Sequence, residues 1–198
     1  MNLHRIACVL LALGCLLCSG CILSLNGLGD KEQAVFKPDL LGKWVDKPDE
    51  PTWTFAKGED DKAYVLTVSG RKGEKEQSLF HVRLFELGDR LFLDMMPHEK
   101  MLEEKEGQKT RGDLYNWCLI PGHMIARIKS MKPNLRMAFL NHDAVEQLKP
   151  QLRGDLEIQK INDRHVITSP TPKLRAFLTR IAGDEEVWKG ESDLTKAR

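Results

Sequence analysis

The chain has 198 residues and is close to electrically neutral, with 30 Lys and Arg against 29 Asp and Glu. This balance gives no basic field that would favour nucleic acid, and the length fits one domain with a sizeable core. Four of the five cysteines lie within the first 21 residues, so no disulfide can form within the domain that follows, and its core must supply the stability.

The first segment, residues 1–20, has the pattern of an export signal peptide. Arg5 is followed by an apolar run from Ile6 to Cys18, and two small residues then precede Cys21. The run is too short for a permanent membrane-spanning helix, which needs about 20 residues. The segment Leu17–Cys21 resembles the lipobox of bacterial lipoproteins, which implies cleavage in front of Cys21 and lipid attachment to it. The alternative is a leader that is cleaved without lipid attachment.

The same resemblance implies a location. A lipid on Cys21 anchors the protein to a membrane of the bacterial cell envelope, with the domain facing the periplasm. Ile22 follows the cysteine where an Asp would otherwise stand, and this is similar to lipoproteins that are sent to the outer membrane rather than retained at the inner one.

The next segment, residues 21–37, has no sustained hydrophobic periodicity, and we expect a flexible tether there. Residues 38–190 are expected to form the domain. Its first part consists of short runs rich in Val, Ile, Phe, Tyr and Trp, separated by turn residues, as in consecutive antiparallel strands. We expect strands at residues 42–46, 52–57, 62–69, 78–87, 90–96, 122–131, 134–140, 156–161 and 164–169.

Two irregularities interrupt this pattern. Leu84 and Phe85 are both apolar, which indicates either a β-bulge or burial on both faces of the strand. Between the strands at 90–96 and 122–131 lies a long connection, which begins with many charges and ends in an apolar segment. Such an arrangement is typical of a lid folded over a cavity or cleft. The residues of this possible ligand lid are Leu114, Tyr115, Trp117 and Ile120.

Two short helices are expected near the C-terminus. The first is capped by Asn141 or Asp143 and is limited or bent by Pro150. The second has Thr171 as a plausible N-cap and Pro172 at the first helical position. Its apolar residues recur at helical spacing and need a hydrophobic partner. They are Leu174, Phe177, Leu178 and Ile181. Residues 191–198 are expected to be a frayed polar tail.

The start of the domain resembles a known family. Gly42 and Trp44 form a Gly-x-Trp motif at the head of the first strand, after a short helical turn opened by Pro38. Followed by a run of hairpin-linked strands, this is similar to the lipocalin-like (calycin) proteins, including bacterial lipoproteins. The resemblance implies a mainly β fold, an antiparallel up-and-down barrel of about eight to nine strands. In that family both residues are structural, and the tryptophan closes one end of the barrel.

No motif in the sequence indicates catalysis or a cofactor. Cys118 and His123 are five residues apart, but no evident orienting group accompanies them, and the favoured interpretation is a small apolar residue and a strand-edge histidine. His98, His123, His142 and His165 are far apart in sequence, so a metal site would have to be assembled entirely by the fold. We predict no enzyme, no cofactor and no metal site.

Two binding functions remain open. In the first, the barrel holds a small hydrophobic ligand such as a fatty acid, which requires an apolar cavity of at least about 300 Å³ opening near Trp117. In the second, the barrel is filled and the protein is a docking or maintenance module of the envelope that binds a protein partner. The sequence favours the first function, and neither function involves nucleic acid.

Overall fold

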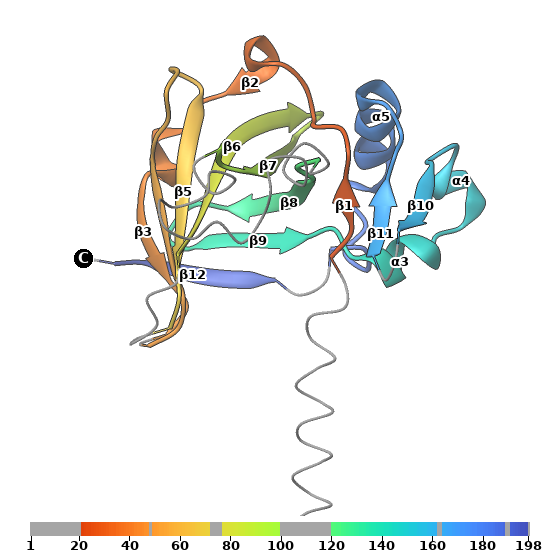
Figure 1. Ribbon diagram of the computed structural model, residues 1–198. Coiled ribbons are helices and arrows are strands. Elements are labelled where there is room, and N and C mark those ends of the chain that lie inside the picture. The colour runs from red at the N-terminus through yellow and green to blue at the C-terminus, as the bar shows by residue number, and fades with distance from the viewer. Residues whose placement is uncertain are drawn as a thin grey trace, which may run out of the picture.

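The computed structural model describes residues 21–47, 49–71, 77–99, 120–161, 164–188 and 191–197. Its centre is a closed antiparallel barrel of eight strands (Figure 1). Seven of them follow one another around the barrel in chain order, and a strand from the C-terminus closes the circle. They are β3 (Gly42–Val45), β4 (Thr52–Lys57), β5 (Ala63–Ser69), β6 (Gln77–Leu87), β7 (Arg90–Pro97), β8 (His123–Ser130), β9 (Leu135–Phe139) and β12 (Ser192–Lys196).

The predicted fold class is confirmed, but the barrel does not use all the expected strands. The strands expected at 156–161 and 164–169 are β10 (Ile158–Ile161) and β11 (Arg164–Ile167), which lie outside the barrel. They pair with each other, and β11 also pairs in parallel with β1 (Leu23–Ser24). The eighth barrel strand is β12, in the segment that was expected to be a frayed tail.

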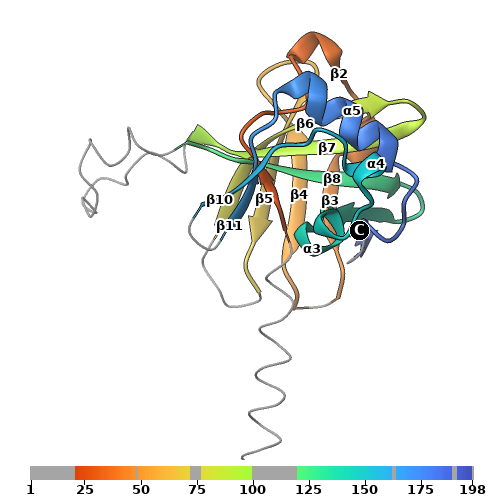
Figure 2. The same ribbon diagram turned by 90° about the vertical axis from the view of Figure 1, so that its right-hand side faces the viewer.

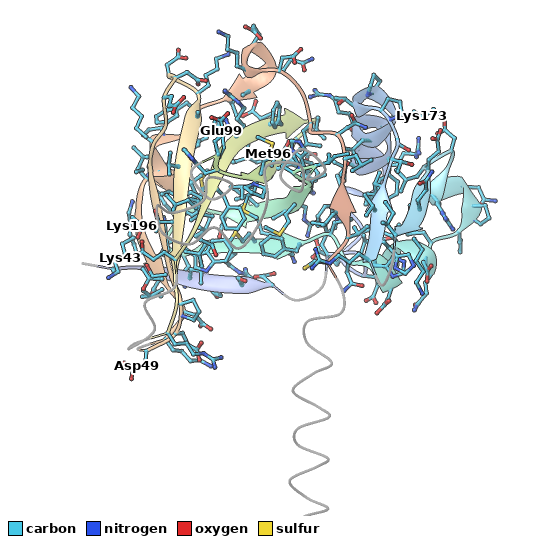
Figure 3. All side chains as sticks on the ribbon, in the orientation of Figure 1. Lys43, Asp49, Met96, Glu99, Lys173 and Lys196 are labelled. Atoms are coloured by element: carbon cyan, nitrogen blue, oxygen red, sulfur yellow. The ribbon has the colours of Figure 1, made fainter. Side chains whose placement is uncertain are left out.

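That expectation for residues 191–198 is therefore wrong for the part that the structure describes. β12 pairs with β3 on one side and with β9 on the other, so it joins the two ends of the sheet. Leu194, its single apolar residue, is buried inside the barrel. Figure 3 shows Lys196 of β12 beside Lys43 of β3 at this closure. Backbone hydrogen bonds on both sides hold β12 in the sheet, so one buried apolar side chain is enough to anchor it in the core.

Two hydrophobic cores share the wall of the barrel. One fills the interior, and the other lies between the outer face of β6, β7 and β8 and a second layer of helices and short strands. Leu84 belongs to the inner core and Phe85 to the outer core, so burial on both faces explains the loss of alternation there. The same holds for Leu93 and its neighbour Phe92.

The second layer contains three short helices, where two were expected (Figure 2). Pro150 divides the first expected helix into α3 (His142–Glu146) and α4 (Pro150–Arg153), because its ring cannot continue the helix. Asn141 caps α3 by accepting a hydrogen bond from the Ala144 N–H. The last helix, α5 (Thr171–Ile181), buries the whole predicted apolar stripe in the outer core. Its N-cap is Pro170, and the Thr171 hydroxyl donates to the Gly27 carbonyl instead.

The segment expected as a tether, residues 21–37, is part of the fold. It contains β1, β2 (Ala34–Val35) and one 3-10 turn, η1 (Lys31–Gln33), and a second 3-10 turn, η2 (Pro38–Leu40), begins directly after it. β1 pairs with the start of β8 where β9 no longer reaches, and β2 pairs with the end of β6 beyond β5. Ile22, Leu28 and Ala34 are buried in the outer core. The tether prediction is corrected because this segment covers strand edges that the barrel leaves open.

A chain of ion pairs holds the segment after α5 against the barrel. The Arg127 guanidinium is buried, donates to the Ala182 carbonyl and to Glu185, and lies 5.6 Å from the centre of the Trp188 ring. Hydrogen bonds from Lys129 and Arg127 hold the pKa of the Glu185 carboxyl at about 2. Lys129 also pairs with Glu191, so the segments on both sides of residues 189–190 are tied to β8.

Replacing Leu194 with Ala should lower the free energy of unfolding by about 2–5 kcal/mol, because it leaves a cavity at the closure of the barrel. Urea denaturation would measure the change. Asp193→Ala, on the exposed face of the same strand, is the control and should change stability by less than about 1 kcal/mol. Equal and small effects of the two substitutions would contradict the role of β12.

Glu185→Gln should flatten the acid dependence of stability. The folded-state pKa of Glu185, about 2, lies below its ordinary value of 4.5. Its contribution is therefore fully present above about pH 4.5 and is lost as the pH falls toward about 2. Urea denaturation from about pH 6 to about pH 2.5 should show a smaller loss for Glu185→Gln than for the natural protein or the exposed control Glu59→Gln. Three parallel profiles would refute the assignment.

Candidate functional site

Cys21, the expected lipid attachment residue, lies at the surface of the folded domain. Its backbone forms an isolated antiparallel bridge with Asn141, and the next residue, Ile22, is buried and donates its N–H to the Leu140 carbonyl. Cys21 itself is exposed. Residues 1–20, the expected signal peptide, lie outside the described residues. A lipid on Cys21 would therefore be attached within one residue of the core.

Gly42 and Trp44 lie on β3 at one corner of the barrel. Trp44 is only 1% exposed, and its indole N–H donates to the Leu40 carbonyl over 2.8 Å. The Lys196 ammonium lies 5.0 Å from the centre of its ring. Gly42 has a φ of 122°, and a Cβ there would lie 2.8 Å from the Lys196 side chain. Both features explain why this corner of the barrel suits glycine and tryptophan.

The interior of the barrel is occupied by its own side chains. Inward residues from all eight strands form one buried cluster, and its largest members are Trp44, Phe55 and Tyr64. At one end, Leu40 of η2 covers the interior. Three of four pockets among the described residues have no lining residue from this cluster, and the fourth, beside β12, touches it only through Leu194. The interior therefore resembles a packed core rather than a ligand cavity.

The opposite end of the barrel is apolar but only partly buried. Trp53 and Phe139 face each other there from β4 and β9, with ring centres 6.3 Å apart. Val68, Phe80 and Met124 complete this group, which we call the apolar mouth. The β3–β4 and β5–β6 hairpins and the β7–β8 connection leave from this end of the barrel. It is the place where a hydrophobic ligand could contact the barrel.

The structure supplies only part of the expected lid. Leu114, Tyr115 and Trp117 lie outside the described residues, as does Cys118. Ile120 is described and is 73% exposed. It is one of the few large apolar side chains that face solvent among the described residues.

A pocket of about 730 Å³ with a mixed polar and apolar lining lies outside the barrel. It is bounded by Gly27 and Gly29, by the start of α5 and Arg175, and by His123. The Arg175 guanidinium donates to the Leu28 carbonyl over 2.7 Å, so it also fixes the loop that forms this wall. The pocket is therefore a feature of the seam between the N-terminal segment and α5.

His123 has an orienting partner that sequence reasoning missed. The Asp94 carboxylate is 6% exposed, lies 2.7 Å from His123 Nδ1, and accepts a hydrogen bond from the Leu28 N–H. Asp94 follows Leu93, which points into the barrel, so strand alternation could have placed Asp94 on the outer face of β7, beside β8. Because Asp94 serves both the imidazole and the N-terminal segment, the pair has a clear structural role.

The histidines that were expected to be scattered are partly brought together. His142 on α3 and His165 on β11 lie against each other with ring centres 3.4 Å apart. Glu146, one helical turn after His142, completes a group that can hold a metal ion. The sequence could have indicated that His142 and Glu146 share a helix face, because they are four residues apart. It could not predict the contact with His165, which depends on the pairing of β11 with β1.

Comparisons with protein-family models, with curated proteins and with solved structures gave no match. Among the described residues, no helix combines the length and the apolar content needed to cross a bilayer.

Replacing Trp44 with Ala should cost about 3–5 kcal/mol of unfolding free energy, because it empties a large site in the inner core and leaves the Leu40 carbonyl without its donor. Trp44→Phe keeps the apolar ring and should cost less. Thermal and urea denaturation would measure both. An unchanged melting temperature for Trp44→Ala would show that this residue does not support the barrel.

Proposed function

We propose that the protein is a lipid-anchored, exported protein of the bacterial cell envelope that acts without catalysis, as a docking or maintenance module binding a protein partner. The observation that carries this choice is the filled barrel. The sequence favoured a ligand inside the barrel, but the inward side chains of the described strands occupy that space. A filled barrel is a rigid scaffold, and binding then falls to its surface and loops.

The position of Cys21 supports a defined orientation on the membrane. Since Cys21 is bridged to Asn141 and is followed by buried Ile22, a lipid there would hold the domain close to the bilayer. The chain enters β1 from the lower side in Figures 1 and 2, and the β3–β4 hairpin, which carries Asp49, points to that side (Figure 3). The β6–β7 turn and η1 belong to the other end of the barrel from this hairpin, and a partner would meet them there.

A small hydrophobic ligand is the second candidate, and one observation favours it. The apolar mouth leaves Trp53, Phe80 and Phe139 only partly buried. In this alternative, an acyl chain would lie across the mouth rather than deep in the barrel. The two candidates therefore make opposite predictions about what accompanies the purified protein.

Native mass spectrometry of the mature protein, purified in detergent from its own bacterial envelope, should show the chain and its covalent acyl groups alone. A photo-crosslinking residue in place of Asp89, on the β6–β7 turn, should give a discrete adduct with an envelope protein in living cells. The same residue in place of Lys47, on the β3–β4 hairpin, is the control and should not give that adduct.

A stoichiometric lipid that is lost when Trp53 and Phe139 are both replaced with Ser would overturn the docking proposal in favour of the ligand.

Cys21→Ala should leave an unprocessed precursor without acyl label. Normal acylation of that variant would remove the anchor from the proposal.

A further inference from the structure

Three side chains from two elements outside the barrel converge beside the N-terminal strand. His142 begins α3, Glu146 lies one turn later on the same face, and His165 comes from the middle of β11. One possible ligand atom from each lies within 4.8 Å of the others. Two imidazoles and a carboxylate form a ligand set that zinc and related divalent transition metals prefer.

The surroundings of His142 fix which of its ring nitrogens is available. The side chain is 8% exposed, and its Nδ1 lies 3.2 Å from the Asp143 carboxylate, which can accept the Nδ1–H. A neutral ring with its proton on Nδ1 carries a lone pair on Nε2. A carboxylate that orients a histidine in this way is the usual outer partner of a histidine bound to a metal.

The other ring nitrogen of His142, Nε2, is buried close to a carboxylate without a hydrogen bond. It lies 3.2 Å from the Glu146 carboxylate, yet the approach does not have the geometry of a hydrogen bond, and the buried Nε2 has no other partner. A lone pair on Nε2 and a carboxylate oxygen repel each other at this distance, so the contact needs a nearby positive charge. Either a second proton on His142 or a metal ion can supply it.

The His165 ring supports the metal. It stacks on His142 with an angle of 6° between the ring planes, and one of its ring nitrogens lies within 4.8 Å of the ligand atoms of His142 and Glu146. Because a nitrogen lone pair lies in the plane of its ring, the half-buried His165 ring must tilt out of the stack for both imidazoles to share one ion. A second imidazole adds a lone pair to the site but no charge. A metal ion can bind this additional lone pair, whereas a proton shared by His142 and Glu146 does not need it.

We propose that His142, Glu146 and His165 bind one divalent transition metal ion, with Zn²⁺ as the best fit, and that Asp143 positions His142. Zinc bonds to nitrogen and oxygen are about 2.0–2.2 Å long, so the ligand atoms must close in slightly. Glu146 can supply this movement because its side chain is 55% exposed. Three protein ligands leave a position for water or for a group from outside.

The site is built into the fold independently of the proposed docking function. Val145 of α3 is buried in the outer core, and Asn141, the N-cap of α3, bridges Cys21. A metal joining α3 to β11 would therefore brace the layer that receives the start of the mature chain.

The test is a titration of the full chain in detergent with Co²⁺ and then Zn²⁺, after its thiols are blocked with iodoacetamide so that cysteines do not compete. One equivalent of Co²⁺ should produce visible d–d absorption, and one equivalent of Zn²⁺ should remove it. Glu146→Gln and His165→Gln should each weaken binding at least about tenfold, and Asp143→Ala about tenfold. His81→Ala, on β6 and away from the site, should bind as the natural protein does.

Glu146→Gln keeps the test valid if His142→Ala fails to fold, because Glu146 is largely exposed. Equal affinities for the natural protein and for both Glu146→Gln and His165→Gln would overturn the site. So would the absence of Co²⁺ absorption at millimolar metal, and the contact between His142 and Glu146 would then be bridged by a proton.

Discussion

Burial of both faces of β6, β7 and β8 is the constraint on which the rest of the structure depends. Adjacent residues such as Leu84 and Phe85 point to opposite sides of the wall, and each is buried in a different core. An apolar outer face on a barrel cannot remain in water, so it requires a second layer. α5, β1 and the loops around them supply that layer (Figure 2), and Phe177 and Trp188 pack into it.

This second layer also explains how the start of the chain is held. The segment after Cys21 fills strand edges that the barrel leaves open, and Asp94, Thr171 and Arg175 fix its loop through hydrogen bonds to backbone groups. Tyr64 fixes the end of the segment by exchanging hydrogen bonds with the backbone of Lys37. An anchor on Cys21 would thus act on the folded domain directly, which links the outer core to the proposed position at the membrane.

Strong periodic signals in the sequence were sufficient for most of the fold. The barrel strands from β3 to β9 and the stripe of α5 lie within one or two residues of their predicted ranges. Residues 21–37 were missed because β1 and β2 are two residues long, too short for any periodicity. β12 was missed because Leu194 is its single apolar residue. The pairing of His142 with His165 depends on tertiary contacts that no local pattern encodes, although Glu146 at helical spacing was visible.

The central claim is that the barrel and the outer layer form one cooperative unit joined by the shared wall. Hydrogen exchange of the mature protein in increasing urea, resolved by peptide, tests it most directly. The account predicts that amides of residues 22–28 and of α5 lose protection at the same urea concentration as amides of β5 and β6. Loss of protection in residues 22–28 and α5 at clearly lower urea, with the barrel still protected, would contradict it.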